Sequence, residues 1–138
     1  VVGIAVYFVT VYFTEIRIYN LWFVILITFL TSFVFATAGF INAAYAKSFD
    51  DINIVPTFVL TPLIYLGGTF YSIESLPQIW QDFSNINPIA YIVSSYRYGF
   101  LGIEEINIFL ALAIVLVFAV MLFIIGVQIL NKGVGIKN

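Results

Sequence analysis

One uninterrupted apolar block near the end of the chain constrains the fold more than any other feature. Residues 109–130 form a run of twenty-two residues without a charged side chain. At about 1.5 Å of rise per residue, a helix of that length extends roughly 33 Å, and the hydrocarbon core of a bilayer is ~30 Å thick. The block therefore predicts a membrane-spanning helix. The function must then be one that is performed in, on or across a membrane.

The amino-acid composition agrees with a membrane protein and excludes several kinds of chemistry. Hydrophobic residues make up 63% of the chain and charged residues 9%, which is more apolar surface than a soluble domain of this size can bury. The absence of cysteine and histidine excludes Cys- or His-ligated metal sites and thiol or imidazole catalysis. Five basic residues spread along the chain make no patch for nucleic acid.

Four apolar blocks divide the chain into predicted helices. Residues 21–46, 52–71 and 109–130 are each long enough to cross a bilayer. Residues 1–14 are too short for that and are apolar from the first position, so we expect them to be the end of a span that begins upstream. We predict an all-α fold, a polytopic transmembrane helical bundle in a single domain over residues 1–138 that is truncated at its N-terminus.

A polar segment between the second and third complete spans carries the signals of a short helix. Ser75 resembles an N-cap, and Pro77 follows at the position of a first helical turn. The pattern predicts a short amphipathic helix over residues 76–83.

A second start signal follows in Asn87-Pro88, and Gly102 resembles a helix stop. Residues 88–101 then form a helix of fourteen residues, which is too short to cross a bilayer. Together the two helices predict a re-entrant helical hairpin over residues 76–101 that dips into one leaflet from the interface.

The basic residues predict how the chain is oriented. If three complete spans alternate and the hairpin returns to its own side, then Lys47, Lys132 and Lys137 share one side. Arg17 and Arg97 fall on the other side. The positive-inside rule places the three lysines, and with them the C-terminus, in the cytoplasm.

Small residues line one face of the first complete span. Ser32, Ala36, Gly39 and Ala43 are spaced four, three and four residues apart, so they share a helical face. Such a stripe lets another helix approach closely in lipid. We interpret it as a helix-packing surface, although small residues are common in membrane helices in general.

The second complete span contains two helix breakers. Pro56 and Pro62 each remove a backbone donor, and Gly67-Gly68 follows near the end of the block. The pattern favours a bent span over a flexible helix at a moving interface. The glycine pair lacks the lysine of a phosphate-binding loop, so no nucleotide site is predicted.

Arg97 is the charged residue that most needs an explanation, because it lies inside an apolar, aromatic run. A cation near the bilayer midplane costs at least ~2.5 kcal/mol on insertion scales. Arg97 therefore either snorkels to the outer headgroups, or orders the hairpin or lines a substrate path. Glu104-Glu105 could pass for a catalytic carboxylate pair, but adjacent residues on a helix do not share a face. We expect both to lie in water at the start of the last span.

Several motifs resemble a known family. The runs PTFVLTPLIYLGGTFYSIESLPQIW and NINPIAYIVSSYRYGFLG, together with AKSFDD and the tail NKGVGIKN, cover most of the chain. They resemble the C-terminal half of a type-2 ABC-transporter permease, and within that family the bacterial inner-membrane export permeases.

The resemblance implies properties that the spacing of residues does not. The intact permease would have six spans, would pair with a second permease copy as a homodimer and would dock two separate ATP-binding subunits. ATP would be held on those partners and no cofactor in this chain, which would be a transport component in the bacterial inner membrane and not itself an enzyme. Exported substrates in the family include drugs, lipids and polysaccharides.

The resemblance also marks candidate site residues in the hairpin. Arg97, Tyr91, Asn87 and Pro88 are candidates for a transport path or gate. The competing hypothesis is a small structural or assembly protein of the membrane with no transport activity. An ion channel is a third reading, but the sequence has no acidic ring or carbonyl filter motif.

Overall fold

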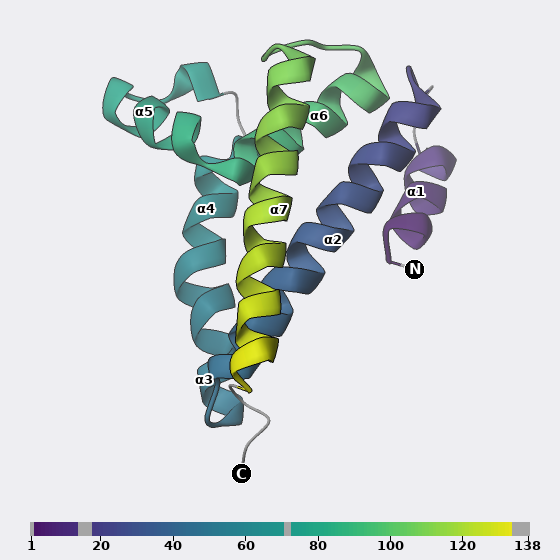
Figure 1. Ribbon diagram of the computed structural model, residues 1–138. Helices are drawn as coiled ribbons and strands as arrows, with labels where there is room; N and C mark the ends of the chain where they lie inside the picture. Colours follow the sequence, from purple (N-terminus) through teal and green to yellow (C-terminus); the bar gives the residue numbers. More distant parts are fainter. Residues whose placement is uncertain (1, 14–17, 71–72, 134–138) are drawn as a thin grey trace.

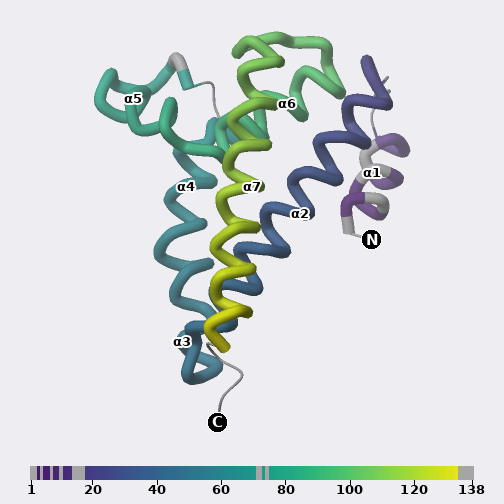
Figure 2. The backbone as a smooth tube through the Cα atoms, in the orientation of Figure 1, coloured from purple at the N-terminus to yellow at the C-terminus, as the bar shows by residue number. Residues whose placement is uncertain are grey.

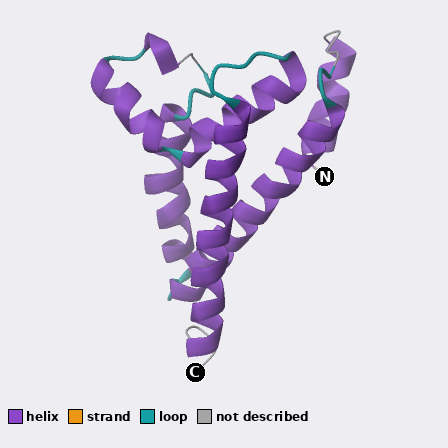
Figure 3. Cartoon of the chain, turned by 45° about the horizontal axis from the view of Figure 1, so that its top comes forward, coloured by secondary structure: helices purple, strands orange, loops and turns teal. Residues whose placement is uncertain are grey.

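The computed structural model describes residues 2–13, 18–70 and 73–133, and these residues form helices and short connections without a strand (Figures 1 and 3). This confirms the predicted all-α class. In chain order the elements are α1 (Val2–Phe13), α2 (Leu21–Tyr45), α3 (Phe49–Val55), the π-helix η1 (Pro56–Leu60), α4 (Thr61–Leu66), the 3₁₀ helix η2 (Ile73–Ser75), α5 (Gln78–Ile86), α6 (Pro88–Leu101) and α7 (Ile108–Lys132).

Three stretches among the described residues are long and apolar enough to cross a membrane: Leu21–Tyr45, Phe49–Leu66 and Ile108–Lys132. The first and third lie within two residues of the predicted bounds. Each begins at an asparagine whose side-chain oxygen accepts from backbone N–H groups of the first turn, Asn20 in α2 and Asn107 in α7.

The middle span differs from its prediction of residues 52–71. It begins earlier because Ser48 and Asp51 form a capping box, in which each side chain accepts from the other residue's backbone N–H. It ends earlier because Gly68 has a φ of 75°, a left-handed conformation that stops a helix. Local caps therefore set the ends of this span, and hydropathy does not.

The two short helices of the hairpin are present. α6 has the predicted bounds, and Gly102 ends it with a φ of 72°. α5 begins later than predicted, and the N-cap position is Pro77, not Ser75. Ser75 instead ends the 3₁₀ helix η2, because that turn reaches the N-terminus of α5 before a serine cap can form.

The core lies where α2, α6 and α7 meet. α2 and α7 lie close together at the end that carries Lys132 and diverge toward the hairpin end, where α6 fills the space between them (Figures 1 and 2). The buried apolar side chains of this core are Ile27, Val34, Tyr91, Ile92, Ala111, Val115 and Ala119. Hydrogen bonds from Asn20 N to Gly99 O (2.9 Å) and from Tyr19 N to Phe100 O (3.2 Å) tie the start of α2 to α6.

The middle span stands beside this core without entering it. None of the residues of α3, η1 and α4 is buried. The turn between α2 and α3, which contains Lys47, lies at the same end of the molecule as the end of α7, which contains Lys132, and α5 and α6 lie at the opposite end (Figure 1). This arrangement agrees with the alternation of spans from which the orientation is predicted. Arg17 and Lys137 lie outside the described residues.

Candidate functional site at the end of the middle span

The backbone carbonyl groups at the end of α4 need hydrogen-bond donors, and the hairpin supplies them. The last carbonyl groups of a helix have no partner within the helix, and in a membrane an unsatisfied carbonyl is costly. Side chains from α5 and α6 reach the last turn of α4 and the glycine turn that follows it. The polar side chains of this contact are Ser84, Asn87 and Arg97. Together with Glu105, which pairs with Arg97, we call them the α4 cap cluster.

Asn87 connects α4 and α6 directly. Its Oδ1 accepts from Ile89 N at 3.0 Å and so caps the start of α6, while its Nδ2 donates to Leu63 O at 2.6 Å. Only 3% of Asn87 is exposed, so both bonds are shielded from water. Pro88 occupies the first turn of α6, where the missing N–H has no helical partner to lose.

Ser84 and Thr69 satisfy two further carbonyl groups of α4. The Ser84 hydroxyl lies 2.7 Å from Leu66 O and 2.9 Å from Trp80 O, and its proton can be donated to either. Ser84 is buried. The Thr69 hydroxyl donates to Ile64 O at 3.1 Å. The last turn of α4 is thus held by side chains that come from the turn after it and from the hairpin.

Arg97 completes the cluster by joining three segments. One guanidinium nitrogen donates to both carboxylate oxygens of Glu105, each at 2.8 Å, and the other nitrogen donates to Gly68 O. A cation beside the carbonyl end of a helix is also favoured by the helix dipole. These contacts favour the interpretation that Arg97 orders the hairpin over simple snorkelling to the headgroups.

Of the four residues predicted for a path or gate, three lie together and the fourth lies apart in the core. Asn87, Pro88 and Arg97 belong to the region where α6 meets the end of α4. Tyr91 is buried among core side chains, and its hydroxyl donates to Asn85 O at 2.6 Å, which closes the turn between α5 and α6. Tyr91 therefore stabilises the turn between α5 and α6 from within the core.

The sequence does not predict the contacts of two members of the α4 cap cluster, Glu105 and Ser84. We expect Glu105 to lie in water, and it is exposed, but the sequence does not indicate that its carboxylate is the partner of Arg97. Glu104 accepts from Ile108 N at 3.3 Å, which places an acid at the positive end of α7 as expected. Ser84 gives no signal in the sequence, because a serine on an amphipathic helix is ordinarily read as a surface residue.

The small-residue stripe points away from the core. Ser32, Ala36, Gly39 and Ala43 are all exposed in this chain, and a Cβ at Gly39 would have no atom within 4 Å. Its use as a helix-packing surface stays a prediction.

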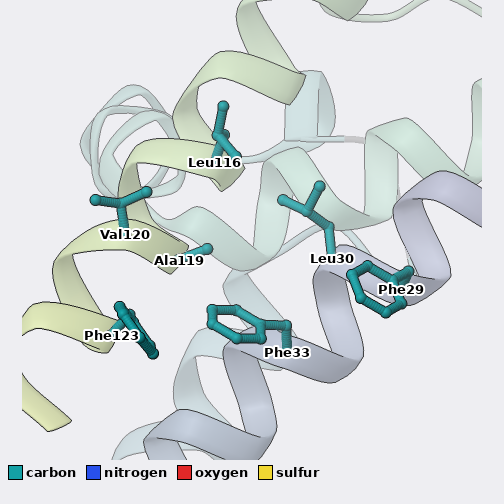
Figure 4. Close-up of a pocket in the computed structure, with 7 residues that line it drawn as sticks. All are labelled: Phe29, Leu30, Phe33, Leu116, Ala119, Val120 and Phe123. Atoms are coloured by element: carbon teal, nitrogen blue, oxygen red, sulfur yellow. The ribbon is translucent and has the colours of Figure 1, made fainter. Parts of the chain in front are cut away.

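An apolar groove of about 230 Å³ lies between α2 and α7. Figure 4 shows Phe29, Leu30 and Phe33 of α2 facing Leu116, Ala119, Val120 and Phe123 of α7. The groove is lined by apolar side chains, so it offers no group for catalysis or for binding a charge. Within the described residues no group of three His, Cys, Asp or Glu side chains is placed to hold a metal ion.

These features define a multi-pass helical membrane protein with a helical hairpin fixed to one end of a span. The sequence profile of the family described as "ABC-2 type transporter" matches residues 1–101. The chain belongs to that family, as the resemblance predicts.

Two named proteins are similar to this chain over most of its length. The chain is similar to "Inner membrane transport permease YadH" of Escherichia coli (strain K12), with 43% identity over 137 residues that cover 99% of this chain and 54% of the relative. It is also similar to "Nodulation protein J" of Sinorhizobium fredii, with 31% identity over 103 residues, 75% of this chain and 39% of the relative. The chain spans about half the length of the curated relatives it matches. No solved structure matches it significantly.

Proposed function

We propose that this chain forms the C-terminal membrane half of the permease in an ATP-driven exporter. The observation that carries the proposal is the identity of 43% to a transport permease over 99% of the chain. The complete permease pairs with a second copy and with two ATP-binding subunits, and moves a drug, lipid or polysaccharide out of the cytoplasm. Family membership supports this assembly. The chain itself has no nucleotide-binding motif, so the proposal places ATP on the partner subunits.

In this proposal the protein lies in the bacterial inner membrane with its C-terminus in the cytoplasm. The lysine-rich end, with Lys47 and Lys132, then faces the cytoplasm and the hairpin faces outward. The position of these two ends on opposite sides of the spans supports the orientation (Figure 1).

The hairpin acts as the outer gate of the export path. Asn87 and Arg97 connect it to the end of α4 and the turn that follows, Pro88 starts α6, and Tyr91 fixes the turn between its two helices. A gate of this kind needs a rigid connection to the span that moves it. The α4 cap cluster provides that connection through hydrogen bonds to backbone carbonyls, which do not depend on the side chains of α4.

Export can be tested in cells of the source organism that lack the permease gene. We expect at least one drug, lipid or polysaccharide to accumulate inside these cells and to be released when the full-length permease is restored. Restoration should fail when the ATP-binding subunit carries an inactivated nucleotide site, although the permease still reaches the membrane.

The measurement is mass spectrometry of extracts and medium beside an immunoblot of the membrane fraction. If both strains retain and release the same compounds, and the permease does not purify with an ATP-binding subunit, then a structural or assembly protein of the membrane is the better account.

A further inference from the structure

Pro56 in the middle span removes the usual helical donor of one backbone carbonyl. In a continuous helix the N–H of residue 56 would donate to Ile52 O, but Pro56 has no N–H. Pro56 lies inside the stretch Phe49–Leu66, which is apolar enough to cross a membrane. A donor from a neighbouring side chain satisfies this carbonyl without dependence on water at the membrane boundary.

Asn42 supplies that donor from the neighbouring span. Its Nδ2 donates to Ile52 O at 2.8 Å, across the turn that joins α2 to α3. The Asn42 backbone carbonyl meanwhile accepts from Ala46 N at 3.1 Å, which ends α2. One residue thus closes α2 and holds the carbonyl that the proline frees in α3.

The segment η1, which begins at Pro56 and ends at Leu60, is wound as a π-helix. Thr61 donates twice to Pro56 O, through its backbone N–H and through its hydroxyl at 3.0 Å. Proline and π-turns are places where helices bend. No residue of η1 is buried, so packing within this chain does not oppose a change of curvature there.

The middle span is therefore held at two points and free between them. Below the π-turn, Asn42 ties α3 to α2, and above it the α4 cap cluster ties α4 to the hairpin. Both α2 and α6 belong to the same core. Among these three segments, η1 is the one without a side-chain tie to α2 or the hairpin in the described contacts, so we expect a change in curvature there.

We propose that Asn42 is a positioning residue that acts with Pro56 as a latch. The proline frees the Ile52 carbonyl, the Asn42 amide holds it, and the resulting tie confines the bending of the middle span to η1. That the bending serves export rests on the proposed function. The tie itself is a property of the folded chain and is tested separately.

A double-mutant cycle in the full-length permease separates the latch from ordinary packing. Asn42→Leu removes the amide donor, and Pro56→Ala restores an N–H that can satisfy Ile52 O within the helix. We expect Asn42→Leu alone to lower the midpoint of thermal unfolding by about 3 °C or more, because it orphans a carbonyl. In the Pro56→Ala chain the same change should lower it by less than half as much.

Matched controls make the outcome specific. Pro77→Ala changes a proline outside the spans and should leave the effect of Asn42→Leu undiminished. Asn131→Leu replaces an exposed asparagine of α7 and should shift the midpoint little. Asn42→Gln keeps an amide donor and should retain more stability than Asn42→Leu, which keeps the test valid if the leucine variant does not accumulate.

An equal effect of Asn42→Leu with and without Pro56 would overturn the latch, whatever the export assay shows. In the export assay we expect Asn42→Leu to reduce release severalfold and Pro56→Ala to restore part of it. If the unfolding cycle shows the coupling but the wild-type permease exports nothing, the latch stands and the proposed function fails.

Discussion

Replacing Arg97 by alanine in the full-length permease is expected to reduce export about tenfold or more while the protein still reaches the membrane. The change leaves the Glu105 carboxylate and the Gly68 carbonyl without their donor. Hydrogen bonds to charged groups contribute about 1.5–3 kcal/mol, and 1.4 kcal/mol corresponds to tenfold. The pair is 24% and 33% exposed, so the lower part of that range applies.

Two further substitutions show whether Arg97 acts through these partners. Arg97→Lys should keep little export, because an ammonium does not reproduce the planar fork that reaches Glu105 and Gly68 together. Glu105→Ala combined with Arg97→Ala should be no worse than Arg97→Ala alone, since the two side chains form one interaction.

Glu104→Ala is the matched control for Glu105→Ala. Glu104 is the adjacent carboxylate and accepts from the start of α7, so its loss should change export by less than about twofold. Unchanged export in the Arg97→Ala permease would remove Arg97 from the mechanism and return it to the snorkelling interpretation.

The substitution Gly99→Ala is expected to loosen the contact between α2 and α6. A Cβ at position 99 would lie 2.6 Å from Val24 Cγ2, which forces the two helices apart at the place where Asn20 N donates to Gly99 O. Overpacking of this kind costs about 1–3 kcal/mol. We expect the midpoint of thermal unfolding of the full-length permease to fall by several degrees, about 2–4 °C per kcal/mol.

Gly126→Ala is a control within another helix contact of the same core. A Cβ there would lie 3.5 Å from Thr37 Cγ2, which is an ordinary van der Waals distance. Since alanine favours a helix over glycine by about 0.5–1 kcal/mol, Gly126→Ala should raise the midpoint or leave it unchanged. If both substitutions lower it equally, the close approach at Gly99 is not what limits stability.

Features that depend on neighbouring residues in the sequence could be predicted. The apolar lengths of α2 and α7 reflect the thickness of a bilayer, and the Asn87-Pro88 and Gly102 signals define α6 to the residue. The middle span was placed too late because its bounds depend on the capping box at Ser48 and on the left-handed Gly68. These are local features, but hydropathy outweighed them in the prediction.

The partners across the candidate site could not be predicted. Arg97 and Glu105 are eight residues apart, and the bond from Asn87 to Leu63 O joins residues twenty-four apart. No single helix contains both members of either pair, because α6 ends at Gly102 between the first two and the turn between α4 and α5 separates the second two. Ser84 is missed for the same reason, since its acceptor is a backbone carbonyl of another helix.

The hairpin and the lysine-rich end are expected to lie on opposite sides of the membrane, with the hairpin outside. Single cysteines at Asp82 on α5 and at Lys47 between α2 and α3 are suitable probes, because both side chains are exposed and the 138-residue sequence contains no cysteine. The measurement is labelling by a membrane-impermeant maleimide in right-side-out vesicles, before and after permeabilisation. We predict labelling of Asp82→Cys before permeabilisation and of Lys47→Cys only after it. Labelling of Lys47→Cys from outside, or protection of Asp82→Cys until permeabilisation, would contradict this orientation.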